Sequence, residues 1–516
     1  MSPEEKFKEY ETSKGEILWY LGQPDLDKLE SLAEGPGDLW HSSLDQGFTG
    51  IFPELKYQIA VFWWFLNDFE HLDQSVCWRI NPHAFVVRKK VWEIMKGFPV
   101  DYESEIMKAL DLGFRMLRYC GGVPMYIKDL YPKVQQQINI PAKERYLFFL
   151  KNFKKEHAVN MLLKMGSVHP FQEFKAYRKA ASMSYHKNEY PPIPPRKLEE
   201  ISGAPTVSVI IPTMFRQEYT LQLLKDYSLQ TYPVKEVVVV DATPPEERND
   251  DIYNSEVYPF DLKVFWQKTK GSCRARNEAI EECAGDYIIF ADDDTRIPED
   301  FVENHLRLLH TYKVDACNGM DVMARNSYQD LHDLKRILDQ MGLSRWKAGA
   351  AQTFSNANSC VKRSLVEKLI GNDINFDGGY GEDSDFGFSI FEKGHFVMHN
   401  PFSVNLHLKP KAGGYRHWAS QSAILGKKRK KQAWELDKPV GLIKPVPSPT
   451  IMYGILKRFK KDQIREYRSR YFFLYLWQRP KRNFFFRVLK LPYKIKQFNL
   501  SMMYAKNLLK RGERYK

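Results

Sequence analysis

Short apolar runs alternate with amphipathic stretches between residues 204 and 300. The runs Val207–Ile211, Glu236–Val240 and Asp286–Phe290 are rich in β-branched and aromatic residues, which predicts buried strands. The spacing of apolar residues predicts helices over Tyr219–Leu229 and Ala275–Cys283. Strands that alternate with helices predict a doubly wound α/β sheet with parallel strands. Because ligands bind at the carboxyl ends of such strands, we expect the chemistry there.

Two breaks in this pattern divide the chain of 516 residues. The segment Tyr190–Pro195 has the sequence Tyr-Pro-Pro-Ile-Pro-Pro, which cannot be helical and predicts an extended linker. A second break falls near Gly426, where five successive basic residues begin. We therefore predict an N-terminal region over residues 1–190, a linker over 191–203, a catalytic domain over 204–426 and a tail over 427–516.

Positive charge is concentrated in the tail. Residues 427–516 hold 26 Lys and Arg against 5 Asp and Glu, a net charge of +21, whereas the whole chain carries +13 and residues 1–426 therefore −8. Aromatic runs such as Tyr471–Trp477 interleave these cations, as in helices that lie on anionic membrane surfaces. The pattern predicts a basic α-helical tail on an anionic membrane surface. An oligomer interface and a nucleic-acid site are the alternatives, with nucleic acid the less favoured partner.

The chain shows no targeting or spanning segment by its sequence. It opens without the basic and then apolar run of a signal peptide, and no stretch of about 18–20 apolar residues is present to cross a bilayer. Its six cysteines are scattered without a CxxC pair, which is typical of reduced, buried thiols. These features predict a cytoplasmic protein that is peripheral on the inner face of the membrane.

Acidic residues stand at the carboxyl ends of two predicted strands. One strand runs directly into Asp292, Asp293 and Asp294, and another ends at Asp241. Adjacent carboxylates after an apolar strand are costly unless a cation neutralises them. Oxygen ligands suit Mn²⁺ or Mg²⁺, which can also hold a diphosphate. A solvated acidic turn or a helix N-cap before Pro298 is the alternative. Neither explains why polar residues also end two other predicted strands, at Asp241 and at Pro212-Thr213.

A basic turn, Lys268–Asn277, opens the helix between these strands. Backbone N–H groups at a helix N-terminus favour phosphate, and so do nearby cations. Lys270, Gly271 and Arg276 are therefore candidate diphosphate ligands. A solvated loop can have the same composition, and the neighbouring Asp cluster is what favours a diphosphate clamp.

A second acidic motif, Gly381-Glu382-Asp383, precedes a run of phenylalanines that predicts a helix. Glu382 and Asp383 would lie at the helix N-terminus, where the helix dipole favours an ionised carboxylate that can accept a proton from a hydroxyl. Ordinary helix capping is the alternative. His407 follows an apolar strand and precedes a Gly pair, which makes it a candidate metal ligand, although a lone histidine is more often structural.

Together and in this order, these motifs resemble those of family 2 glycosyltransferases with the GT-A fold. The resemblance covers roughly residues 204–415 and rests on Val207–Thr213, Val238–Asp241, Ala275–Asn277, Phe290–Asp294 and Gly381–Asp383. It implies a GT-A-type doubly wound mixed sheet and an inverting transfer from a nucleotide-diphosphate sugar. The acceptor would be a hydroxyl of a glycan or of a lipid-linked molecule, as in polysaccharide or glycoconjugate biosynthesis.

The resemblance also implies roles for single residues. The nucleotide sugar would be bound by Pro212, Thr213, Asp241, Asp292 and Asp293, with Thr213 and Asp241 on the base or ribose. Mn²⁺ or Mg²⁺ would be held by Asp292, Asp294 and His407, with Asp294 as the most direct ligand. Asp383, next to Glu382, would be the general base. The sequence departs from the family in Ala242–Pro245, where the family often has an acid or amide and then Gly-Ser, so the base-recognition loop is unusual.

The N-terminal region echoes part of the catalytic domain. With a shift of 275, matching residue types stand at Asn81/Asn356, Val86/Val361, Arg88/Arg363 and Val91/Val366. Leu112–Phe114 is similar to Lys393–Phe396, whereas Asp101–Glu103 stands where Gly-Glu-Asp is expected, and no strand ends in an Asp triplet. We predict a degenerate, non-catalytic, partial GT-A-like copy, with chance similarity as the alternative.

Two other classes of function compete. A catalytically inactive glycosyltransferase-like scaffold at a membrane is disfavoured because the acidic set and His407 are intact. A nucleotidyltransferase would carry a Gly-rich basic loop after its first strand, where this chain has Pro212–Phe215. The sequence leaves the donor sugar, the acceptor, the linkage and the oligomeric state open.

Overall fold

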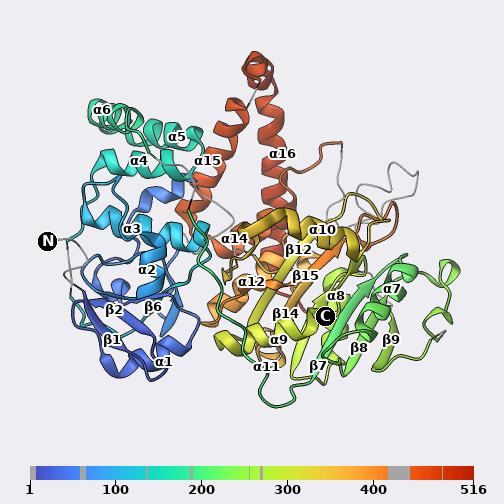
Figure 1. Cartoon of the computed structure of the whole chain (residues 1–516). Coiled ribbons are helices and arrows are strands. Elements are labelled where there is room, and N and C mark those ends of the chain that lie inside the picture. The colour runs from blue at the N-terminus through green and yellow to red at the C-terminus, as the bar shows by residue number, and fades with distance from the viewer. Residues whose placement is uncertain are drawn as a thin grey trace. The chain divides into compact units, whose positions relative to one another are not determined.

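The computed structural model describes residues 7–58, 66–134, 137–185, 190–254, 256–267, 271–351, 353–415, 442–478 and 480–516. The chain forms two compact units. The first comprises Met1–Pro194, Lys347–Ala350 and Arg458–Tyr493, and the second comprises Pro195–Trp346, Ala351–Lys457 and Lys494–Lys516. The first boundary, between Pro194 and Pro195, falls in the Pro-rich segment. Figure 1 shows the elements of both units.

The first unit is built on a mixed sheet with the order β1-β2-β5-β3-β6-β4. Its strands are β1 (Lys8–Glu11), β2 (Ile17–Leu21), β3 (Leu39–His41), β4 (Gln74–Val76), β5 (Phe85–Arg88) and β6 (Pro124–Ile127). Its sheet-associated helices are α1 (Leu29–Glu34), α2 (Lys89–Met95) and α3 (Glu105–Arg115). The buried core between sheet and helices includes Leu39, Phe85, Trp92 and Leu112, so the unit has an apolar centre of its own.

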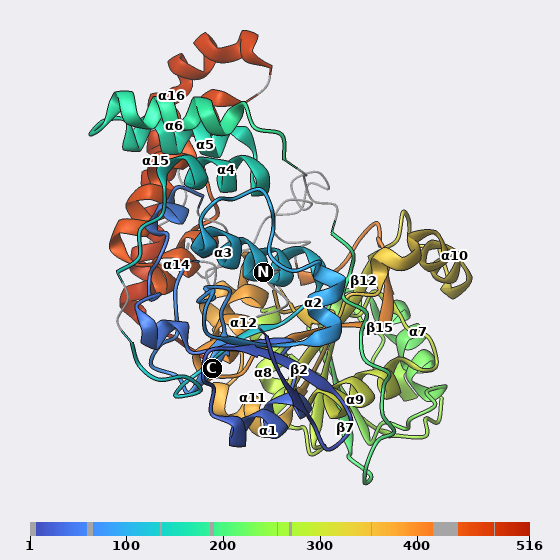
Figure 2. The same ribbon diagram turned by 60° about the vertical axis from the view of Figure 1, so that its left-hand side comes forward.

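A helical layer completes the first unit. The helices α4 (Ala142–Asn152), α5 (Lys155–Met165) and α6 (Pro170–Ala181) pack on one another, as both views show (Figure 1, Figure 2). Helix α15 (Lys461–Trp477), from the tail, packs on α5 and on the turn Pro53–Gln58. Lys164 Nζ lies 3.2 Å from Glu466, and Gln463 donates a 2.8 Å hydrogen bond to Asn67. Much of the described tail is therefore integral to this unit.

The second unit has a larger mixed sheet with the order β11-β15-β12-β14-β10-β7-β8-β9. Its strands are β7 (Val207–Thr213), β8 (Glu236–Asp241), β9 (Asp261–Trp266), β10 (Tyr287–Ala291), β11 (Thr295–Arg296), β12 (Ala316–Met323), β14 (Asn358–Lys362) and β15 (Met398–His407). The strands β9, β8, β7 and β10 are parallel, which confirms the prediction from the alternating pattern. The antiparallel pairing of β14 with β10 and with β12 makes the sheet mixed.

Helices pack on this sheet and position the strand ends. They are α7 (Gln217–Ser228), α8 (Ser272–Glu281), α9 (Phe301–Tyr312), α10 (Leu331–Met341), α11 (Arg363–Leu369), α12 (Glu382–Glu392) and α14 (Pro449–Arg458). α8 packs on β7 and β8, and α9 packs on β12 and β15. Every residue of β7 and β8 is buried, which agrees with their mostly apolar, β-branched composition. β9 was not predicted because charged Asp261 and Lys263 interrupt its apolar pattern.

The end of the chain also contributes to the second unit. α16 (Phe484–Arg511) carries the buried residues Phe498 and Leu508 in its second half. Tyr453 of α14 is buried and donates a 2.6 Å hydrogen bond to Asp373. Across the residues that the structure describes, no helix combines the length and the apolar character needed to cross a membrane.

Candidate functional site

A pocket of 370 Å³ in the second unit lies at the carboxyl ends of β7 and β10 and at the N-terminus of α12. It gathers most of the residues that the sequence analysis singled out, namely Pro212, Arg276, Asp292, Asp293, Asp294, Glu382, Asp383 and His407. Thr213, Asp241 and Gly271 are not among the residues that line it. Lys270 lies outside the described residues.

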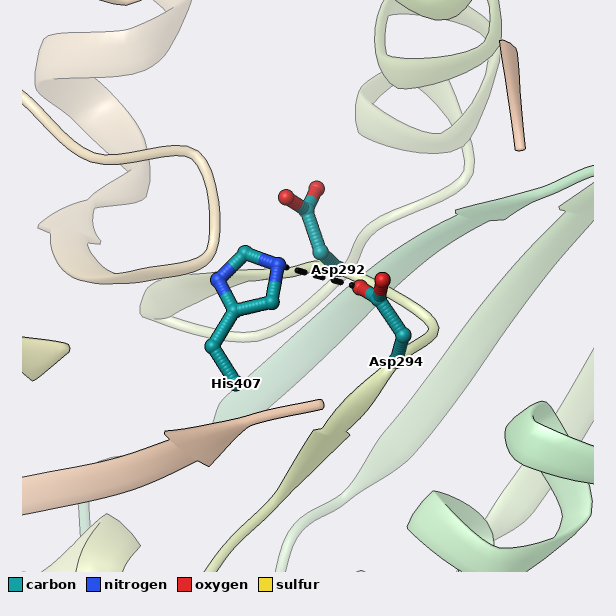
Figure 3. Close-up of side chains that lie close together, drawn as sticks. All are labelled: Asp292, Asp294 and His407. Carbon is teal, nitrogen blue, oxygen red and sulfur yellow. Dashed lines mark ion pairs between the residues drawn. The ribbon is translucent and has the colours of Figure 1, made fainter. Parts of the chain in front are cut away.

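One part of the pocket wall offers ligands for a cation. Asp292, Asp294 and His407 each present one ligand atom, and these atoms lie within 4.8 Å of one another (Figure 3). Two carboxylates and one imidazole fit Mn²⁺ or Mg²⁺, which accept oxygen ligands and tolerate a histidine. Long-range pairing builds the set, because Thr295 of β11 pairs with His407 of β15 and so places the histidine beside Asp294.

His407 lies between two carboxylates. Its Nε2 is 3.2 Å from Asp294, and its Nδ1 is 3.1 Å from Asp321. Burial lowers the pKa of the imidazole, but the hydrogen bonds and charges of the two carboxylates outweigh it and raise the pKa to about 11. Asp321, which the sequence analysis missed, therefore orients the ring from the side opposite Asp294.

The middle acid of the triplet is held by the protein itself. Asp293 accepts a 2.7 Å hydrogen bond from Thr213 and lies 3.0 Å from the Arg216 guanidinium, which also reaches Asp294 at 2.7 Å. Burial raises the pKa of Asp293 to about 7, although Arg216 opposes the shift. Thr213 therefore acts behind the pocket wall by fixing Asp293. The sequence analysis missed Arg216, whose only local signal is a cation three residues after the end of a buried strand.

The carboxylate of Asp241 is surrounded by hydrogen-bond donors of the second unit. It is fully buried at the end of β8 and accepts hydrogen bonds from Thr243 N–H at 2.8 Å, from the Tyr253 hydroxyl at 3.0 Å and from the Gln217 side chain at 3.1 Å. These contacts tie the loop after β8 to the start of α7.

The N-terminus of α8 accepts a carboxylate from within the chain. Asp377 Oδ1 accepts a 2.7 Å hydrogen bond from the Cys273 N–H, and a Cβ at Gly271 would collide with the same carboxylate. Burial raises the pKa of Asp377 to about 7. Arg276, farther along α8, does line the pocket, where its guanidinium lies 2.7 Å from Asp292.

The predicted helix after the second acidic motif is confirmed, because α12 begins at Glu382 behind Gly381, whose φ is 105°. Both Glu382 and Asp383 line the pocket. Asn356 donates a hydrogen bond to Asp383 and is itself buried. The sequence analysis had used Asn356 only as part of a repeat. Asp385, two residues on, is buried and is not among the lining residues.

The second unit is thus an α/β domain with an acidic pocket at the ends of its parallel strands. Residues 208–370 match the model of the family described as "Glycosyl transferase family 2". Residues 208–370 therefore form a family 2 glycosyltransferase domain, and its mixed α/β sheet agrees with the doubly wound sheet that the sequence predicts.

Curated relatives carry matching names. "Probable glycosyltransferase YdaM" of Bacillus subtilis is 27% identical over 230 residues, which cover 42% of this chain and 54% of that protein. The Campylobacter jejuni "GalNAc(5)-diNAcBac-PP-undecaprenol beta-1,3-glucosyltransferase" is 19% identical over 224 residues, which cover 43% of this chain and 68% of that protein. The chain spans about half the length of the first of these relatives.

Solved structures show a weaker similarity. Staphylococcus aureus TarS residues 1–349, in complex with UDP-GlcNAc, align with a TM-score of 0.36 and 15% identity over 58% of this chain and 81% of that chain. The mannosyltransferase PcManGT of Pyrobaculum calidifontis, in complex with GDP-Man and Mn²⁺, aligns with a TM-score of 0.33 and 18% identity over 67% of this chain and 95% of that chain.

Proposed function

We propose that the second unit transfers a sugar, with inversion, from a nucleotide-diphosphate sugar to a hydroxyl of a glycan or a lipid-linked acceptor. The observation that carries this proposal is the composition of one pocket. It combines a cation-ligand set, two arginines and a carboxylate at a helix N-terminus. The family match over residues 208–370 supports the same class of reaction.

The donor half of the pocket would bind the diphosphate. Asp292, Asp294 and His407 would hold Mn²⁺ or Mg²⁺, which when bound neutralises charge on the departing diphosphate. Arg216 and Arg276 add positive charge at the same wall. Pro212 and Asp293 would border the donor. Thr213 and Asp241 would act from behind, because Thr213 fixes Asp293 and Asp241 ties the loop after β8 to the start of α7.

The acceptor half would supply the base. A carboxylate oxygen of Asp383 would take the proton of the acceptor hydroxyl while the hydroxyl oxygen forms a bond to the anomeric carbon. The bond from that carbon to the diphosphate oxygen breaks, and its electron pair leaves with the nucleotide diphosphate. Attack opposite the leaving group inverts the configuration. Asn356 orients the base, because it donates to Asp383 from a buried position.

The tail would bind an anionic membrane on its cytoplasmic face. Phe485, Phe486 and Leu489 are 77%, 66% and 77% exposed at the start of α16, where Arg487 and Lys490 stand among them. Exposed apolar groups interleaved with cations favour a headgroup surface. The Campylobacter jejuni relative, named for an undecaprenol-linked acceptor, supports a lipid-linked acceptor for this chain too.

A donor panel tests the proposal. The full chain is incubated with UDP-, GDP- and dTDP-sugars and with an undecaprenyl-type acceptor, and nucleotide-diphosphate release is measured with Mn²⁺, with Mg²⁺ and with EDTA. Acceptor-dependent release from one donor that EDTA abolishes supports the proposal. Release that persists in EDTA overturns the metal assignment, and no release from any donor favours an inactive scaffold.

A further inference from the structure

The two units share one run of elements. In the second unit the shared elements are β10, α9, β12, β14, α11, α12 and β15, with β11 and α10 inserted among them. In the first unit they are β2, α1, β3, β5, α2, α3 and β6, with β4 inserted. The third element, β12 or β3, pairs antiparallel with the fourth, β14 or β5, and parallel with the last, β15 or β6. The fourth also pairs antiparallel with the first, β10 or β2. Element order and strand pairing therefore agree throughout the run.

The register of this repeat is fixed by helix ends. α2 and α11 are seven residues long, and each ends on a left-handed residue followed by a Gly with positive φ, Lys96-Gly97 and Ile370-Gly371. These positions differ by 274, because α2 begins at residue 89 and α11 at residue 363. The shift of 275 used on the sequence alone is therefore wrong by one residue.

The same shift of 274 aligns the next pair of helices. Asp111–Phe114 of α3 has the sequence Asp-Leu-Gly-Phe, and Asp385–Phe388 of α12 has the sequence Asp-Phe-Gly-Phe. Gly113 lies inside its helix, as Gly387 does, whereas Gly394 follows a helix. The proposed match between Gly113 and Gly394 is therefore wrong, and Gly387 takes its place.

The repeat continues into the helices that follow. Leu150–Glu156 has the sequence Leu-Lys-Asn-Phe-Lys-Lys-Glu, and Leu456–Asp462 has the sequence Leu-Lys-Arg-Phe-Lys-Lys-Asp. In both, one helix ends, α4 or α14, and the next begins, α5 or α15, after an extended lysine. An identical break between two helices is not expected from a chance match of basic residues.

A buried ion pair recurs between the matched segments. Lys151 matches Lys457 in the two Leu-Lys segments, which differ by 306 positions, and Asp111 matches Asp385 at the shift of 274, whereas Asp101 and Asp373 are not at matching positions. Lys151 Nζ lies 2.9 Å from Asp111 and 2.7 Å from Asp101. Lys457 Nζ lies 2.8 Å from Asp385 and 3.5 Å from Asp373. All six side chains are shielded from solvent to at least 87%. A buried charge needs a partner, so each lysine fixes the helix that carries its aspartate.

The acids of the pocket do not recur in the first unit. At a shift of 274, Lys108 and Ala109 stand where the second unit has Glu382 and Asp383. β2 ends at Leu21 and continues into Gly-Gln-Pro, where β10 continues into the Asp triplet. The first unit thus keeps the lysine–aspartate pair without the residues that would perform chemistry.

We propose that the chain contains an internal duplication and that Lys457 of α14 is a positioning residue for Asp383. This inference rests on the proposed role of Asp383 as the base. Lys457 holds Asp385, which lies half a turn beyond Asp383 in the first turns of α12. By fixing Asp385, the lysine fixes the direction in which the N-terminal turn presents Asp383 to the pocket.

The test compares matched double variants of the full chain. Lys457→Met/Asp385→Asn removes both charges of the pair from the second unit. Asp373 keeps its hydrogen bond from Tyr453, and the half-exposed Glu513, which also lies 2.8 Å from Lys457, keeps its hydrogen bond from Tyr515. Lys151→Met/Asp111→Asn removes the matched pair from the first unit. Both are expected to lower the melting temperature by similar amounts.

Measurements of turnover and of amide hydrogen exchange distinguish a role of Lys457 in positioning Asp383 from a role in overall stability. We expect kcat of the second-unit double variant to fall about 10²-fold, as misplacement of a catalytic group by about 1 Å does. Its KM for the donor should change less than about twofold, amide exchange over residues 381–388 should quicken, and Lys457→Arg should restore turnover to within a few-fold. The first-unit double variant should keep its kcat and the slow exchange of that segment.

Three results overturn the proposal: unchanged exchange over residues 381–388, unchanged kcat in the second-unit variant, or an equal loss of kcat in the first-unit variant. Failure of the proposed function has a different signature. In that case the unmodified chain shows no turnover, or Asp383→Asn keeps full turnover, while the exchange of residues 381–388 still decides whether Lys457 holds α12.

Discussion

The two units have the same order of strand pairing but different residues at the ends of matching elements. In the second unit, Asp292–Asp294 follow β10 and Asp383 stands in the first turn of α12. In the first unit, Gly-Gln-Pro follows β2 and Ala109 stands at the position of Asp383. Both units keep a buried lysine–aspartate pair. The comparison indicates that the order of strand pairing and the buried lysine–aspartate pair are structural features of the fold. The pocket acids are not needed for the fold, because the first unit lacks them.

We expect the largest loss of turnover from substitution of Asp294, one of the acids that follow β10 and have no counterpart after β2 in the first unit. Asp294→Ala should lower turnover by at least about 10³-fold, because it removes a ligand of the cation that neutralises the diphosphate. The measurement is nucleotide-diphosphate release together with Mn²⁺-dependent binding of the nucleotide diphosphate. Turnover within tenfold of the unmodified chain would show that the acidic triplet is a structural turn.

The next effect separates the two carboxylates of α12. Asp383→Asn should lower kcat by about 10²–10⁴-fold, because a general base is lost, while the affinity for nucleotide diphosphate persists. Asp385→Asn should cost less, because Asp385 is buried against Lys457 and outside the pocket lining. The comparison requires kcat and binding for both variants. If Asp385→Asn is inactive and Asp383→Asn retains near-full turnover, the base has been assigned to the wrong residue.

A third prediction concerns the exposed apolar residues at the start of α16, for which we propose membrane binding. Phe485→Ser/Phe486→Ser/Leu489→Ser should weaken binding to anionic vesicles by roughly 10²-fold, because three apolar groups no longer enter the headgroup region. Binding should also weaken with added salt. Turnover on a soluble acceptor should persist. The control is Leu343→Ser, which removes a 79% exposed leucine from the second unit. Equal vesicle binding by both variants would rule out this surface.

The smallest effect is on the pH dependence of stability. Asp377 is buried and its pKa is raised from 3.8 to about 7, whereas Glu103, at the matching position, is exposed and its pKa is lowered through its hydrogen bond with Lys143. A raised folded-state pKa stabilises the fold below pH 3.8, and this contribution is lost as the pH rises through 7. The free energy of unfolding should therefore fall between pH 4 and 7 by up to about 1.4 kcal/mol per unit.

Matched substitutions reveal this contribution. Asp377→Asn should flatten the decline in stability, because a neutral amide can still accept the hydrogen bond from Cys273. Glu103→Gln should leave the slope between pH 4 and 7 nearly unchanged. Urea unfolding at several pH values measures both slopes. An unchanged slope in Asp377→Asn would mean that Asp377 is ionised in the folded state across this range.

The sequence by itself determined the elements with strong local patterns. Val207–Ile211 and Glu236–Val240 are mostly β-branched and apolar, with Ser208 and Glu236 as the exceptions, so their burial as strands β7 and β8 could be predicted from composition. The phenylalanines after Gly381 placed the start of α12 within one turn. Burial of an apolar run depends on the residues in that run, and for that reason such elements and the acids that end them could be predicted.

Only the tertiary structure decided how distant residues combine. Arg216 pairs with Asp293 and Asp294, His407 lies between Asp294 and Asp321, and Lys457 holds Asp385. Each of these contacts joins residues about 70 or more positions apart, so no local sequence pattern predicts them. The shift of 274 between the units likewise became clear only from the helix ends in the structure. The sequence specifies the type of each side chain. Its ionic partner depends on which strands and helices the fold brings together, because an ion pair needs two side chains within a few ångströms of each other.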